Sequence, residues 1–376
     1  MKVMHIVQCS GGVDRYLSML LPLLEQYKLY QILVCSYDYD CKKYINEVDK
    51  VEQLDMKQSF NLLKLIKNIR RIRSLVRYYR PDIVYCHSSI AGGIGRIACC
   101  GLRVKIVYNP HGWAFNMKNR IFIFMRDIKK LVFLCIERLL SRYTDKIVCI
   151  SKAEYISALN HNIADNKKLN IILNGIDFSL IEKAEVKKRS ELGIPENAYI
   201  VGMVGRISPQ KAPDVFIEAA RLIKNEIPNA YFMIVGDGEE HSRIELYAKE
   251  YDIDLYISGW TDVPYQYMKM FDVAMLLSRW EGFGLAIVEY MAARKNFVAT
   301  RVDAIPTIVR DGVDGLLVDV DSPAQAANAV IKLYKDNELA NKMKESAWSY
   351  SREYYDIHRV AEQHLMLFKE LVNINQ

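Results

Sequence analysis

Short apolar runs alternate along the chain with segments whose apolar residues recur every three or four positions. The runs have the length and the Val, Ile and Leu content of strands that are buried on both faces, and the segments between them have helical spacing. Repetition of strand, helix and strand is the pattern of a parallel sheet with crossover helices. The chain is therefore predicted to have an α/β fold.

Two separate series of strands are expected. Those of the first half are Val3–Gln8, Tyr30–Tyr37, Asp82–His87, Lys105–Asn109, Asp145–Ile150 and Leu169–Leu173. Those of the second half are Tyr199–Val204, Ala230–Val235, Leu255–Ser258, Val273–Leu277, Asn296–Thr300 and Gly315–Val318. Helices are expected over Asp14–Gln26, Ser179–Leu192, Leu285–Arg294, Ser322–Lys335, Glu338–Ser349 and Val360–Val372. Pro22 should kink the first helix or end it early. The two series predict two Rossmann-like, doubly wound domains.

A turn signal separates the two series. Asn174-Gly175-Ile176-Asp177 follows the last expected strand of the first half, and Asn-Gly is a strong turn signal. At 376 residues, the chain is long enough for two domains with separate cores. We therefore expect an N-terminal domain over residues 1–177 and a C-terminal domain over residues 178–352. A last helix within residues 353–376 should pack back towards the N-terminal domain.

The composition indicates a globular protein without a membrane span. The chain is 51% hydrophobic and 26% charged, and no apolar run reaches the roughly 20 residues that a transmembrane helix needs. Residues 1–7 already have the pattern of a strand, so we expect no signal peptide and a cytoplasmic protein. The eight cysteines lack Cys-x-x-Cys spacing, so buried thiols are expected rather than disulfides or a zinc site.

Positive charge is concentrated in the first half. Residues 1–178 hold 28 Lys and Arg against 15 Asp and Glu, and residues 179–376 hold 23 against 30. Lys57–Arg80 contains basic residues and no acidic one, and Lys118–Arg142 combines basic residues with an aromatic-rich stretch. The apolar positions at helical spacing in the first of these segments are Leu62, Leu65, Ile66, Ile69, Ile72 and Val76.

These basic segments have more than one interpretation. Both could be crossover helices with their apolar faces on the sheet and solvated basic faces. A sharper hypothesis is a surface that binds anionic lipid headgroups. Nucleic acid is disfavoured because no nucleic-acid-binding module is recognisable and the second half is acidic.

The segment from Ser278 to Glu289 carries the strongest chemical signal. Glu281 and Glu289 stand eight positions apart, with Gly282 and Gly284 between them. Because the segment joins an expected strand to an expected helix, the glycines allow close approach of the backbone, and the first helical turn offers N–H groups to an anion. Carboxylates suit the hydroxyls of a sugar, since they only accept hydrogen bonds. A sugar nucleotide fits both requirements, although an ordinary helix N-terminus with solvated glutamates is the alternative.

Other polar residues also fall where expected strands end. Arg206 and Lys211 follow one strand, and an Arg fork with a Lys point charge suits phosphate oxygens. Glycine-containing turns occur at Gly11-Gly12, Gly236-Asp237-Gly238 and His111-Gly112. Each turn alone could be an ordinary loop. Their shared position, where open α/β sheets bind ligands, favours a joint site.

Together these motifs resemble those of the retaining nucleotide-sugar glycosyltransferases of family 4, which have the two-domain GT-B architecture. The resemblance covers nearly the whole chain. It includes Gly11-Gly12-Val13-Asp14, His111-Gly112, Ile150-Ser151-Lys152, Asn174-Gly175-Ile176-Asp177, Gly205-Arg206 with Lys211, the stretch from Val235 to Glu239, and the stretch from Glu281 to Glu289. The surroundings of Gly11 and His111 are similar to bacterial enzymes that build capsular or exopolysaccharide repeat units. The implied fold is two Rossmann-like domains that face a cleft.

The resemblance implies a role for each motif. Arg206 and Lys211 would hold the donor diphosphate and stabilise the charge that grows on it. Glu289 would accept hydrogen bonds from ribose, Glu281 would face the transferred sugar, and His111 would lie near the reacting centre. The implied catalytic residues are His111, Glu281, Arg206 and Lys211. The implied donor-binding residues are Gly11, Gly12, Arg206, Lys211, Gly236, Gly238, Glu281, Gly282, Phe283, Gly284, Leu285 and Glu289.

The implied activity is transfer of a sugar from a nucleoside diphosphate, expected to be UDP, with retention at the anomeric carbon. The expected acceptor is a lipid-linked glycan at the inner membrane surface, in bacterial surface polysaccharide synthesis. No metal cofactor is expected, and Asp38-Tyr39-Asp40 and Asp252-Ile253-Asp254 are interpreted as surface turns although they imitate a metal-binding motif. A sugar-nucleotide 2-epimerase and a non-catalytic, membrane-attached sugar-nucleotide-binding protein are the alternative functions.

The chain departs from the family in one loop. Family members often carry Gly-Gly-x-x-Glu after the strand that follows the Glu281 segment, whereas this chain has Asp303-Ala304-Ile305-Pro306-Thr307. The loop is therefore expected to be stiffer and to bear an extra charge. This difference bears on the identity of the donor sugar and leaves the diphosphate-binding residues unchanged.

Overall fold

The chain forms two compact units, one of Met1–Gly175 with Ile357–Gln376 and the other of Ile176–Asp356. The computed structural model describes residues 1–8, 11–37, 41–56, 62–116 and 123–373. Each unit contains one parallel sheet with helices between its strands, which confirms the predicted α/β fold. The boundaries predicted from the sequence lie after residues 177 and 352, whereas unit 2 begins at Ile176 and ends at Asp356. The last helix belongs to unit 1.

Unit 1 is built on a seven-stranded parallel sheet with the order β3-β2-β1-β4-β5-β6-β7. Its strands are β1 Lys2–Val7, β2 Tyr30–Ser36, β3 Lys50–Leu54, β4 Ile83–His87, β5 Lys105–Asn109, β6 Lys146–Cys149 and β7 Leu169–Ile171. The strand order changes direction between β1 and β4. This pair is the topological switch point, beyond whose carboxyl ends open α/β sheets bind ligands.

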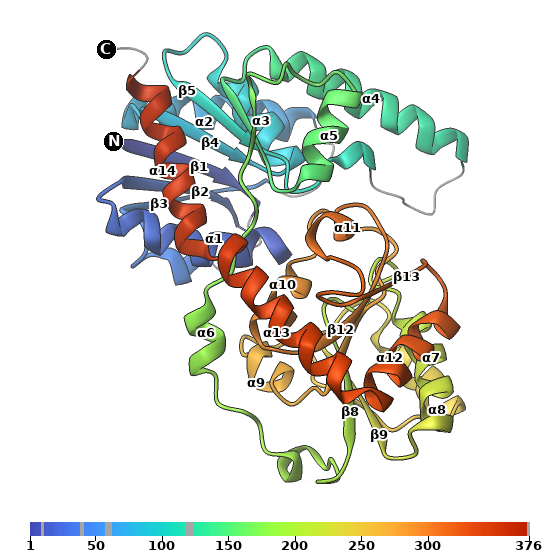
Figure 1. Cartoon of the computed structure of the whole chain (residues 1–376). Helices are drawn as coiled ribbons and strands as arrows, with labels where there is room; N and C mark the ends of the chain where they lie inside the picture. The colour runs from blue at the N-terminus through green and yellow to red at the C-terminus, as the bar shows by residue number, and fades with distance from the viewer. Residues whose placement is uncertain (9–10, 38–40, 57–61, 117–122, 374–376) are drawn as a thin grey trace. The chain divides into compact units, whose positions relative to one another are not determined.

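Helices cover both faces of this sheet (Figure 1). They are α1 Gly11–Gln26, α2 Leu62–Tyr79, α3 Ser89–Cys99, α4 Ile123–Ser141, α5 Lys152–Asn160 and α14 Ile357–Asn373. The last helix, α14, packs against α1. The helices α2, α3 and α4 join β3 to β4, β4 to β5 and β5 to β6, and each of these steps runs towards the β7 edge of the sheet. Because such crossovers are right-handed, the three helices lie on one face of the sheet. Ile72, Ile94 and Leu134 of these helices share a hydrophobic cluster with the sheet.

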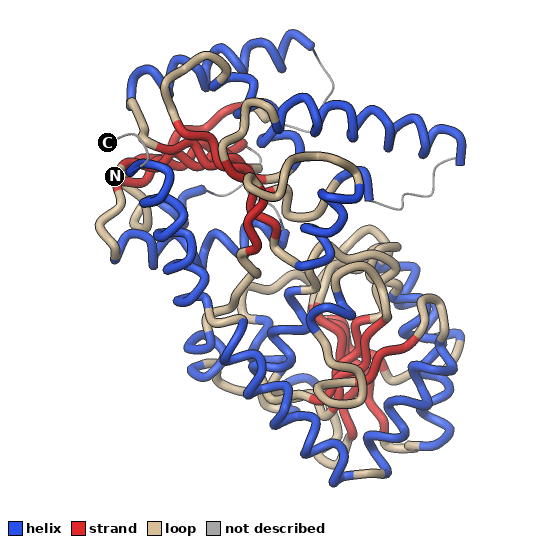
Figure 2. The backbone as a smooth tube through the Cα atoms, turned by 45° about the horizontal axis from the view of Figure 1, so that its top comes forward, coloured by secondary structure: helices blue, strands red, loops and turns tan. Residues whose placement is uncertain are grey.

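Unit 2 has a six-stranded parallel sheet with the order β10-β9-β8-β11-β12-β13, shown in red in Figure 2. Its strands are β8 Tyr199–Val204, β9 Ala230–Val235, β10 Leu255–Ile257, β11 Val273–Leu276, β12 Asn296–Thr300 and β13 Leu316–Val318. Its helices are α6 Phe178–Lys183, α7 Pro213–Glu226, α8 His241–Glu250, α9 Pro264–Met268, α10 Leu285–Ala292, α11 Ile305–Ile308, α12 Pro323–Lys335 and α13 Asn337–Tyr354. The switch point lies between β8 and β11.

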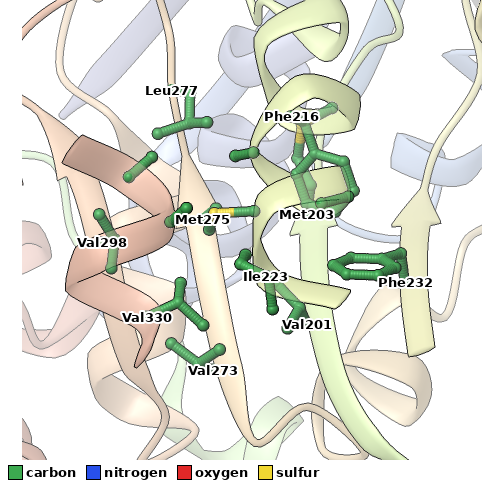
Figure 3. Close-up of a cluster of buried hydrophobic side chains, with 14 of the residues drawn as sticks. Val201, Met203, Phe216, Ile223, Phe232, Val273, Met275, Leu277, Val298 and Val330 are labelled. Carbon is green, nitrogen blue, oxygen red and sulfur yellow. The ribbon is translucent and has the colours of Figure 1, made fainter. Parts of the chain in front are cut away.

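The core of unit 2 fixes the two strands at this switch point. Val201 of β8 and Val273 of β11 are fully buried together with Phe216 and Ile223 of α7 and Val330 of α12 (Figure 3). Close packing of this kind leaves little freedom to the strands. The loops at the carboxyl ends of β8 and β11 therefore start from fixed points.

Three parts of the fold differ from the sequence-based predictions. The edge strand β3 was missed. The helix predicted over Ser179–Leu192 is two pieces, α6 and a 3-10 turn at Arg189–Leu192. Lys269 ends α6 by donating to the carbonyls of residues 182 and 184, at 3.0 and 2.6 Å. The first helix begins at Gly11 rather than Asp14 and continues to Gln26 as predicted, so of the two effects expected of Pro22, a kink or an early end, the early end does not occur.

The cysteines are not uniformly buried thiols. Cys35 and Cys41 are joined by a disulfide, because a short 3-10 turn at Cys41–Tyr44 follows β2 and returns the second cysteine to the first. Cys100 and Cys135 are exposed. The prediction was wrong for these four residues. The thiols that are buried as predicted are those of Cys86, Cys99 and Cys149, and Cys9 lies outside the described residues.

None of the helices that the structure describes combines the length and the apolar character needed to cross a bilayer.

Candidate functional site

Unit 2 brings strand-end loops together at its switch point. The loops follow β9, β8, β11 and β12, which are consecutive neighbours in the sheet. Between them they carry Gly236 and Gly238 after β9, Arg206 and Lys211 after β8, Glu281 after β11, and Asp303 after β12. Polar residues that are up to about 100 positions apart in sequence are thus gathered at one edge of one sheet.

The loops after β8 and β11 meet in an ion pair. Lys211 Nζ lies 2.5 Å from Glu281 Oε1, and the Ser278 hydroxyl donates to the same oxygen at 2.7 Å. Glu281 is only 9% exposed, so the pair is largely shielded from water and from salt. Because two donors already occupy Oε1, Oε2 is the oxygen of Glu281 that can accept from a ligand hydroxyl.

The backbone around Glu281 is held by side chains from the neighbouring loops. Asp303 Oδ2 accepts a hydrogen bond from the Glu281 N–H at 2.9 Å, and Gln210 Nε2 donates to the Trp280 carbonyl at 3.0 Å. Asp303 has a φ of 45°, a left-handed conformation that Asp tolerates better than most residues. The residue that departs from the family pattern therefore supports the Glu281 loop through its side chain.

Arg279 ties the same loop to the start of α7. Its guanidinium donates to Asp214 Oδ2 at 2.7 Å, to Asp321 Oδ1 at 2.6 Å and to the carbonyl of Pro209 at 2.9 Å. Burial alone would raise the pKa of Asp214, but the hydrogen bond and the charge of Arg279 bring it below its usual value. Arg279 therefore fixes the position of the loop beside the Lys211–Glu281 pair.

Arg206 is held more loosely than Lys211. Its Nε lies 3.0 Å from Glu239 Oε2, and the two side chains are 71% and 50% exposed. An ion pair in water contributes little, commonly about 0–1 kcal/mol. Arg206 can therefore exchange Glu239 for a phosphate at small cost.

The glycines of the β9 loop have a packing role in this structure. A Cβ atom on Gly236 would lie 2.1 Å from the carbonyl oxygen of Gly205, and one on Gly238 would lie 2.2 Å from that of Ile207. No side chain fits at such distances. These two glycines allow the β9 loop to lie directly on the β8 loop that carries Arg206.

The helix α10 begins at the far end of the Glu281 loop. Gly284 precedes it with a φ of 89°, a conformation that favours glycine. Phe283 is buried with its ring edge-on to Tyr355, so only its backbone is available to a ligand, whereas Gly282 and Leu285 are partly exposed. The loop is therefore held by the buried Phe283 side chain, and the residues on either side of it can be reached by a ligand.

Glu289 lies inside unit 2. It is 3% exposed, and its Oε1 accepts a hydrogen bond from the Tyr265 hydroxyl at 3.1 Å. No sequence pattern singled out Tyr265. A role of Glu289 in binding ribose stays a prediction, and Tyr265 is the residue that would orient its carboxylate.

Unit 1 places His111 on a strained piece of backbone just beyond β5. His111 has a φ of 51°, and its backbone N–H donates to Asn109 Oδ1 at 3.0 Å. A left-handed conformation is costly for a residue with a Cβ, and such strain is concentrated at functional sites. The ring of His111 is partly exposed, and its Nε2 lies 3.0 Å from Nδ1 of His87, the last residue of β4.

A buried carboxylate holds the turn that follows His111. Glu154 accepts the backbone N–H groups of Gly112 and Ile150, each at 2.7 Å, and its own N–H is capped by the Ser151 hydroxyl. Burial raises the pKa of Glu154 to about 7, against the opposing effect of the two backbone donors. The Ile150-Ser151-Lys152 motif begins α5 and so places Glu154 next to the turn that follows His111.

Comparison with known proteins shows the family to which the chain belongs. Residues 185–349 match the family model Glycosyl transferases group 1, and residues 10–180 match Glycosyltransferase Family 4. The chain is also 31% identical over 294 residues to the Escherichia coli UDP-Gal:alpha-D-GlcNAc-diphosphoundecaprenol alpha-1,3-galactosyltransferase, covering 75% of this chain and 74% of that protein. The chain belongs to the GT-B glycosyltransferases. This result confirms the family-level part of the sequence-based prediction.

Further comparisons agree with this assignment. A Klebsiella pneumoniae protein of the cps region is 26% identical to this glycosyltransferase over 98% of this chain and 99% of its own length. The crystal structure of Anabaena HepE in complex with UDP has a TM-score of 0.81 at 19% identity, covering 98% of this chain and 100% of that one. Sucrose-phosphate synthase from Thermosynechococcus elongatus reaches a TM-score of 0.86 at 18% identity, with 100% of each chain covered. The structural similarities establish the two-domain GT-B fold.

The other predicted residues of this glycosyltransferase are placed as follows. Gly11 and Gly12 form the first residues of α1, beyond the end of β1. Asp252 and Asp254 precede β10, at the opposite edge of the sheet from the loops described above, and Asp254 pairs with Lys224 at 3.1 Å. That string is a surface turn, as predicted. The string from residue 38 to residue 40, together with Lys57, Lys118 and Arg120, lies outside the described residues.

Sequence reasoning missed the residues that support the predicted ones. Arg279 was given no role, Asp303 was seen only as an extra loop charge, and His87 and Asn109 only as the ends of strands. A polar residue at the last position of an otherwise apolar buried strand is a signal that could have identified His87 and Asn109. Glu154 has no such signal, because it resembles any acidic residue in a first helical turn.

Proposed function

We propose that this glycosyltransferase binds a UDP-sugar at the switch-point loops of unit 2 and transfers the sugar with retention of anomeric configuration. The observation that carries the proposal is the convergence of Arg206, Lys211, Glu281 and the N-terminus of α10 at one edge of one sheet. Two cations and a helix N-terminus suit a diphosphate. The free oxygen of Glu281 suits a sugar hydroxyl.

The same groups fit the chemistry of the leaving nucleotide. As the glycosidic bond breaks, positive charge develops on the sugar and negative charge on the diphosphate. Cations and backbone N–H groups that are already in place stabilise this charge without reorganisation. In the proposed mechanism, Arg206 and Lys211 therefore replace a metal ion, and Lys211 leaves its pairing with Glu281 to reach the phosphate.

UDP as the nucleotide is supported by two comparisons. The E. coli relative carries UDP-Gal in its name, and HepE was crystallised with UDP. A thermal-shift panel of UDP, GDP, ADP and their sugars provides the test. Ligand at 100 times its dissociation constant should add about 2.7 kcal/mol to the free energy of unfolding, and we expect this effect for UDP. Retention is then read from the anomeric configuration of the product by NMR, and the absence of any nucleotide effect would overturn the proposal.

We also propose that unit 1 acts at an anionic membrane surface, where it takes a lipid-linked acceptor. The residues concerned lie on α2 and α4, which contact α3 from either side, and are here called the α2/α4 surface. Exposed apolar residues on α4 recur every three or four positions and are 43–59% exposed. They are Ile128, Leu131, Val132, Ile136 and Leu139. Lys129 and Lys130 are exposed beside them.

The start of α2 continues this character. Leu62 and Leu63 are 66% and 78% exposed, so the interpretation of α2 as a crossover helix with its apolar face on the sheet does not hold for its first turn. The buried residues of α2 are Asn68, Ile72, Leu75 and Val76, all of them after its first turn. Lys67 and Arg70 are exposed on the same helix. A helix with apolar and basic residues together outside the core has the composition of an interfacial helix.

Part of the basic charge of α2 is already neutralised within unit 1. Lys64 lies 2.8 Å from Asp55, Arg71 lies 3.6 Å from Glu52, and Arg73 donates to two carbonyls at the end of α3. These three residues are therefore poor candidates for lipid contacts. The exposed basic residues of α2 and α4 that remain as candidates include Lys67, Arg70, Lys129 and Lys130.

Vesicle co-sedimentation tests the α2/α4 surface. Each basic residue near an anionic surface contributes about 1 kcal/mol, so K129E/K130E should weaken binding to phosphatidylglycerol vesicles by about 10-fold or more. Leu131→Ser with Leu139→Ser should reduce the binding that persists at high salt. The matched control changes exposed lysines of unit 2, Lys332 and Lys342, to Glu and should bind as wild type. Equal binding by all variants would contradict the proposal.

A further inference from the structure

Three histidine side chains form a continuous chain through the switch point of unit 1. His5 Nδ1 lies 3.2 Å from His87 Nε2, and His87 Nδ1 lies 3.0 Å from His111 Nε2. The rings are nearly parallel, with interplanar angles of 18° and 25°. His5 and His87 are fully buried, whereas His111 is partly exposed at the carboxyl edge of the sheet. The chain therefore leads from the core to the edge where a ligand would bind.

Desolvation by the surrounding protein keeps all three rings neutral, including that of His111, a residue that only partly reaches the surface. This desolvation lowers the pKa of His5 and of His111 to about 3 and that of His87 well below its usual value. A neutral imidazole has one N–H donor and one bare nitrogen acceptor. Each N···N contact therefore needs one donor and one acceptor, and this requirement couples the protonation patterns of the three rings.

Only two patterns satisfy both contacts. In the outward pattern, His5 Nδ1–H donates to His87, His87 Nδ1–H donates to His111 Nε2, and His111 carries its proton on Nδ1. In the inward pattern every bond is reversed, and His5 carries a proton on Nε2. Nε2 of His5 is buried without a hydrogen-bond partner among the described residues. Since an orphaned buried N–H is rarer than an under-satisfied acceptor, the outward pattern is favoured.

A second network fixes the backbone of the same histidine. Asn109 Oδ1 accepts the His111 backbone N–H at 3.0 Å, and Asn109 Nδ2 donates to the Tyr85 hydroxyl at 3.3 Å. The Tyr85 hydroxyl donates to His364 Nε2 of α14 at 2.9 Å, and His364 Nδ1 donates to the Val360 carbonyl at 2.8 Å. The backbone position of His111 is thus set independently of its ring.

We propose that His87 and His5 are positioning residues that fix the tautomer of His111, so that His111 presents a neutral Nδ1–H donor to an oxygen of the ligand. Within the described part of the chain, Nδ1 of His111 has no hydrogen-bond partner. The ligand oxygen belongs to a substrate of the proposed glycosyl transfer, on which this clause rests. The tautomer itself depends only on unit 1.

The same geometry restricts what His111 can do. If His111 accepted a proton and passed one along the chain, the charge would end on His5, which is fully buried. A buried unpaired charge is strongly unfavourable. His111 therefore acts as a fixed hydrogen-bond donor that orients an oxygen, and no step requires it to become charged.

Long-range 1H–15N NMR of the full chain with 15N-labelled histidine tests the inference directly, because it shows which ring nitrogen is protonated. A free neutral histidine carries its proton mainly on Nε2, so the expected Nδ1–H form of His111 is a distinctive result. His87→Leu should return His111 to the Nε2–H form. His87→Asn keeps a donor near the position of Nδ1 and should restore Nδ1–H. His161→Gln, outside the chain of histidines, is the matched control and should change nothing.

Two results would overturn the inference. One is an Nε2–H tautomer of His111 in the wild-type protein, which needs no variant to fold. The other is an Nδ1–H tautomer that persists in His87→Leu. In a transferase assay, His87→Leu should lower kcat about 10-fold or more with little change in KM for the donor, and His87→Asn should recover part of it. A protein without transferase activity would contradict the proposed function and leave the tautomer result intact.

Discussion

Lys211 and Arg206 differ in what surrounds them, although the sequence presents them as a pair. Lys211 is mostly buried and lies 2.5 Å from a glutamate that is itself 7% exposed in its side chain, whereas the Arg206 side chain is 71% exposed. A charge in a shielded site interacts more strongly with a phosphate than one in water. The two residues should therefore contribute unequally to catalysis.

Lys211→Ala should reduce kcat by about 10²–10³, the range for loss of one charge-stabilising group, and Arg206→Ala should fall at the low end of that range. Steady-state kinetics with the donor identified by the thermal-shift panel measures both. Lys224→Ala, at the opposite edge of the same sheet, is the control and should keep full activity. A folded Arg206→Ala/Lys211→Ala protein with near wild-type activity would exclude the diphosphate assignment.

The two glutamates of the Glu281–Glu289 segment are expected to serve different parts of the donor. Glu289→Gln preserves an acceptor for Tyr265 but loses the charge offered to ribose, so it should weaken UDP binding by about 10-fold. Glu281→Gln should leave UDP binding almost unchanged and weaken binding of the UDP-sugar. Isothermal calorimetry with UDP and with the intact donor separates the two cases. Equal losses for UDP in both variants would show that the roles are wrongly divided.

At the scale of elements, α4 is held to unit 1 by one buried polar cluster as well as by apolar contacts. Arg96 of α3 lies 2.9 Å from Glu137 of α4, its guanidinium lies 3.6 Å from the centre of the Tyr108 ring, and the Tyr108 hydroxyl donates to Glu137 at 3.0 Å. Both charged side chains are almost completely buried. The cluster connects α3, β5 and α4, and it therefore sets the position of the exposed apolar residues on α4.

Removing one partner of this cluster should leave a buried charge unpaired. Glu137→Ala is expected to cost about 3–5 kcal/mol of the free energy of unfolding of unit 1, and the joint change Arg96→Met/Glu137→Leu should cost much less. Urea unfolding measures both. Arg294→Ala breaks an exposed ion pair with Glu345 in unit 2 and should cost less than about 1 kcal/mol. A double variant as unstable as Glu137→Ala would contradict this account.

At the scale of the whole molecule, buried titratable histidines distinguish the two units. His5, His87, His111 and His364 all belong to unit 1; three are fully buried and His111 is partly exposed. Desolvation by the surrounding protein lowers the pKa of each. His241 is the histidine of unit 2, and the hydrogen bond to Asp237 raises its pKa. The two units should therefore respond differently to mild acid.

Unit 1 should lose stability as the pH falls from 7 to 5. The unfolded chain binds protons at histidine near pH 6.5 and the folded unit does not, so the stability contribution is present above pH 6.5 and is lost below it. Each histidine accounts for at most about 2 kcal/mol at pH 5. Glu154, whose folded-state pKa of about 7 has the opposite effect, offsets roughly one of them. A net loss of several kcal/mol is expected.

Differential scanning calorimetry at pH 7, 6 and 5 measures this loss of stability. The unfolding transition of unit 1 should move to lower temperature as the pH falls, and the unfolding transition of unit 2 should change little. Phe216→Ala removes a fully buried ring from the core of unit 2 and identifies its transition, since such a change costs about 3–5 kcal/mol. Transitions that shift together with pH would contradict the expectation.

The fold class, the two series of strands and most of the loops that carry the site could be predicted from the amino-acid sequence alone. Strands such as Lys105–Asn109 and Ala230–Val235 were predicted with the bounds that the structure shows, because a buried parallel strand leaves a continuous apolar run in the sequence. Arg206, Lys211 and Glu281 could be proposed as a set because the carboxyl ends of neighbouring parallel strands meet at one edge.

The contact partner of each of these residues could not be predicted and is known from the folded chain. Asp303, Arg279 and Glu154 support the site through contacts with residues 22 to 65 positions away, and local sequence holds no record of such distant contacts. The same limit explains the exposed start of α2, whose apolar spacing is identical to that of a buried helix. It also explains the chain from His5 through His87 to His111, because the order of strands across the sheet, and not their order in the sequence, brings those three rings into contact.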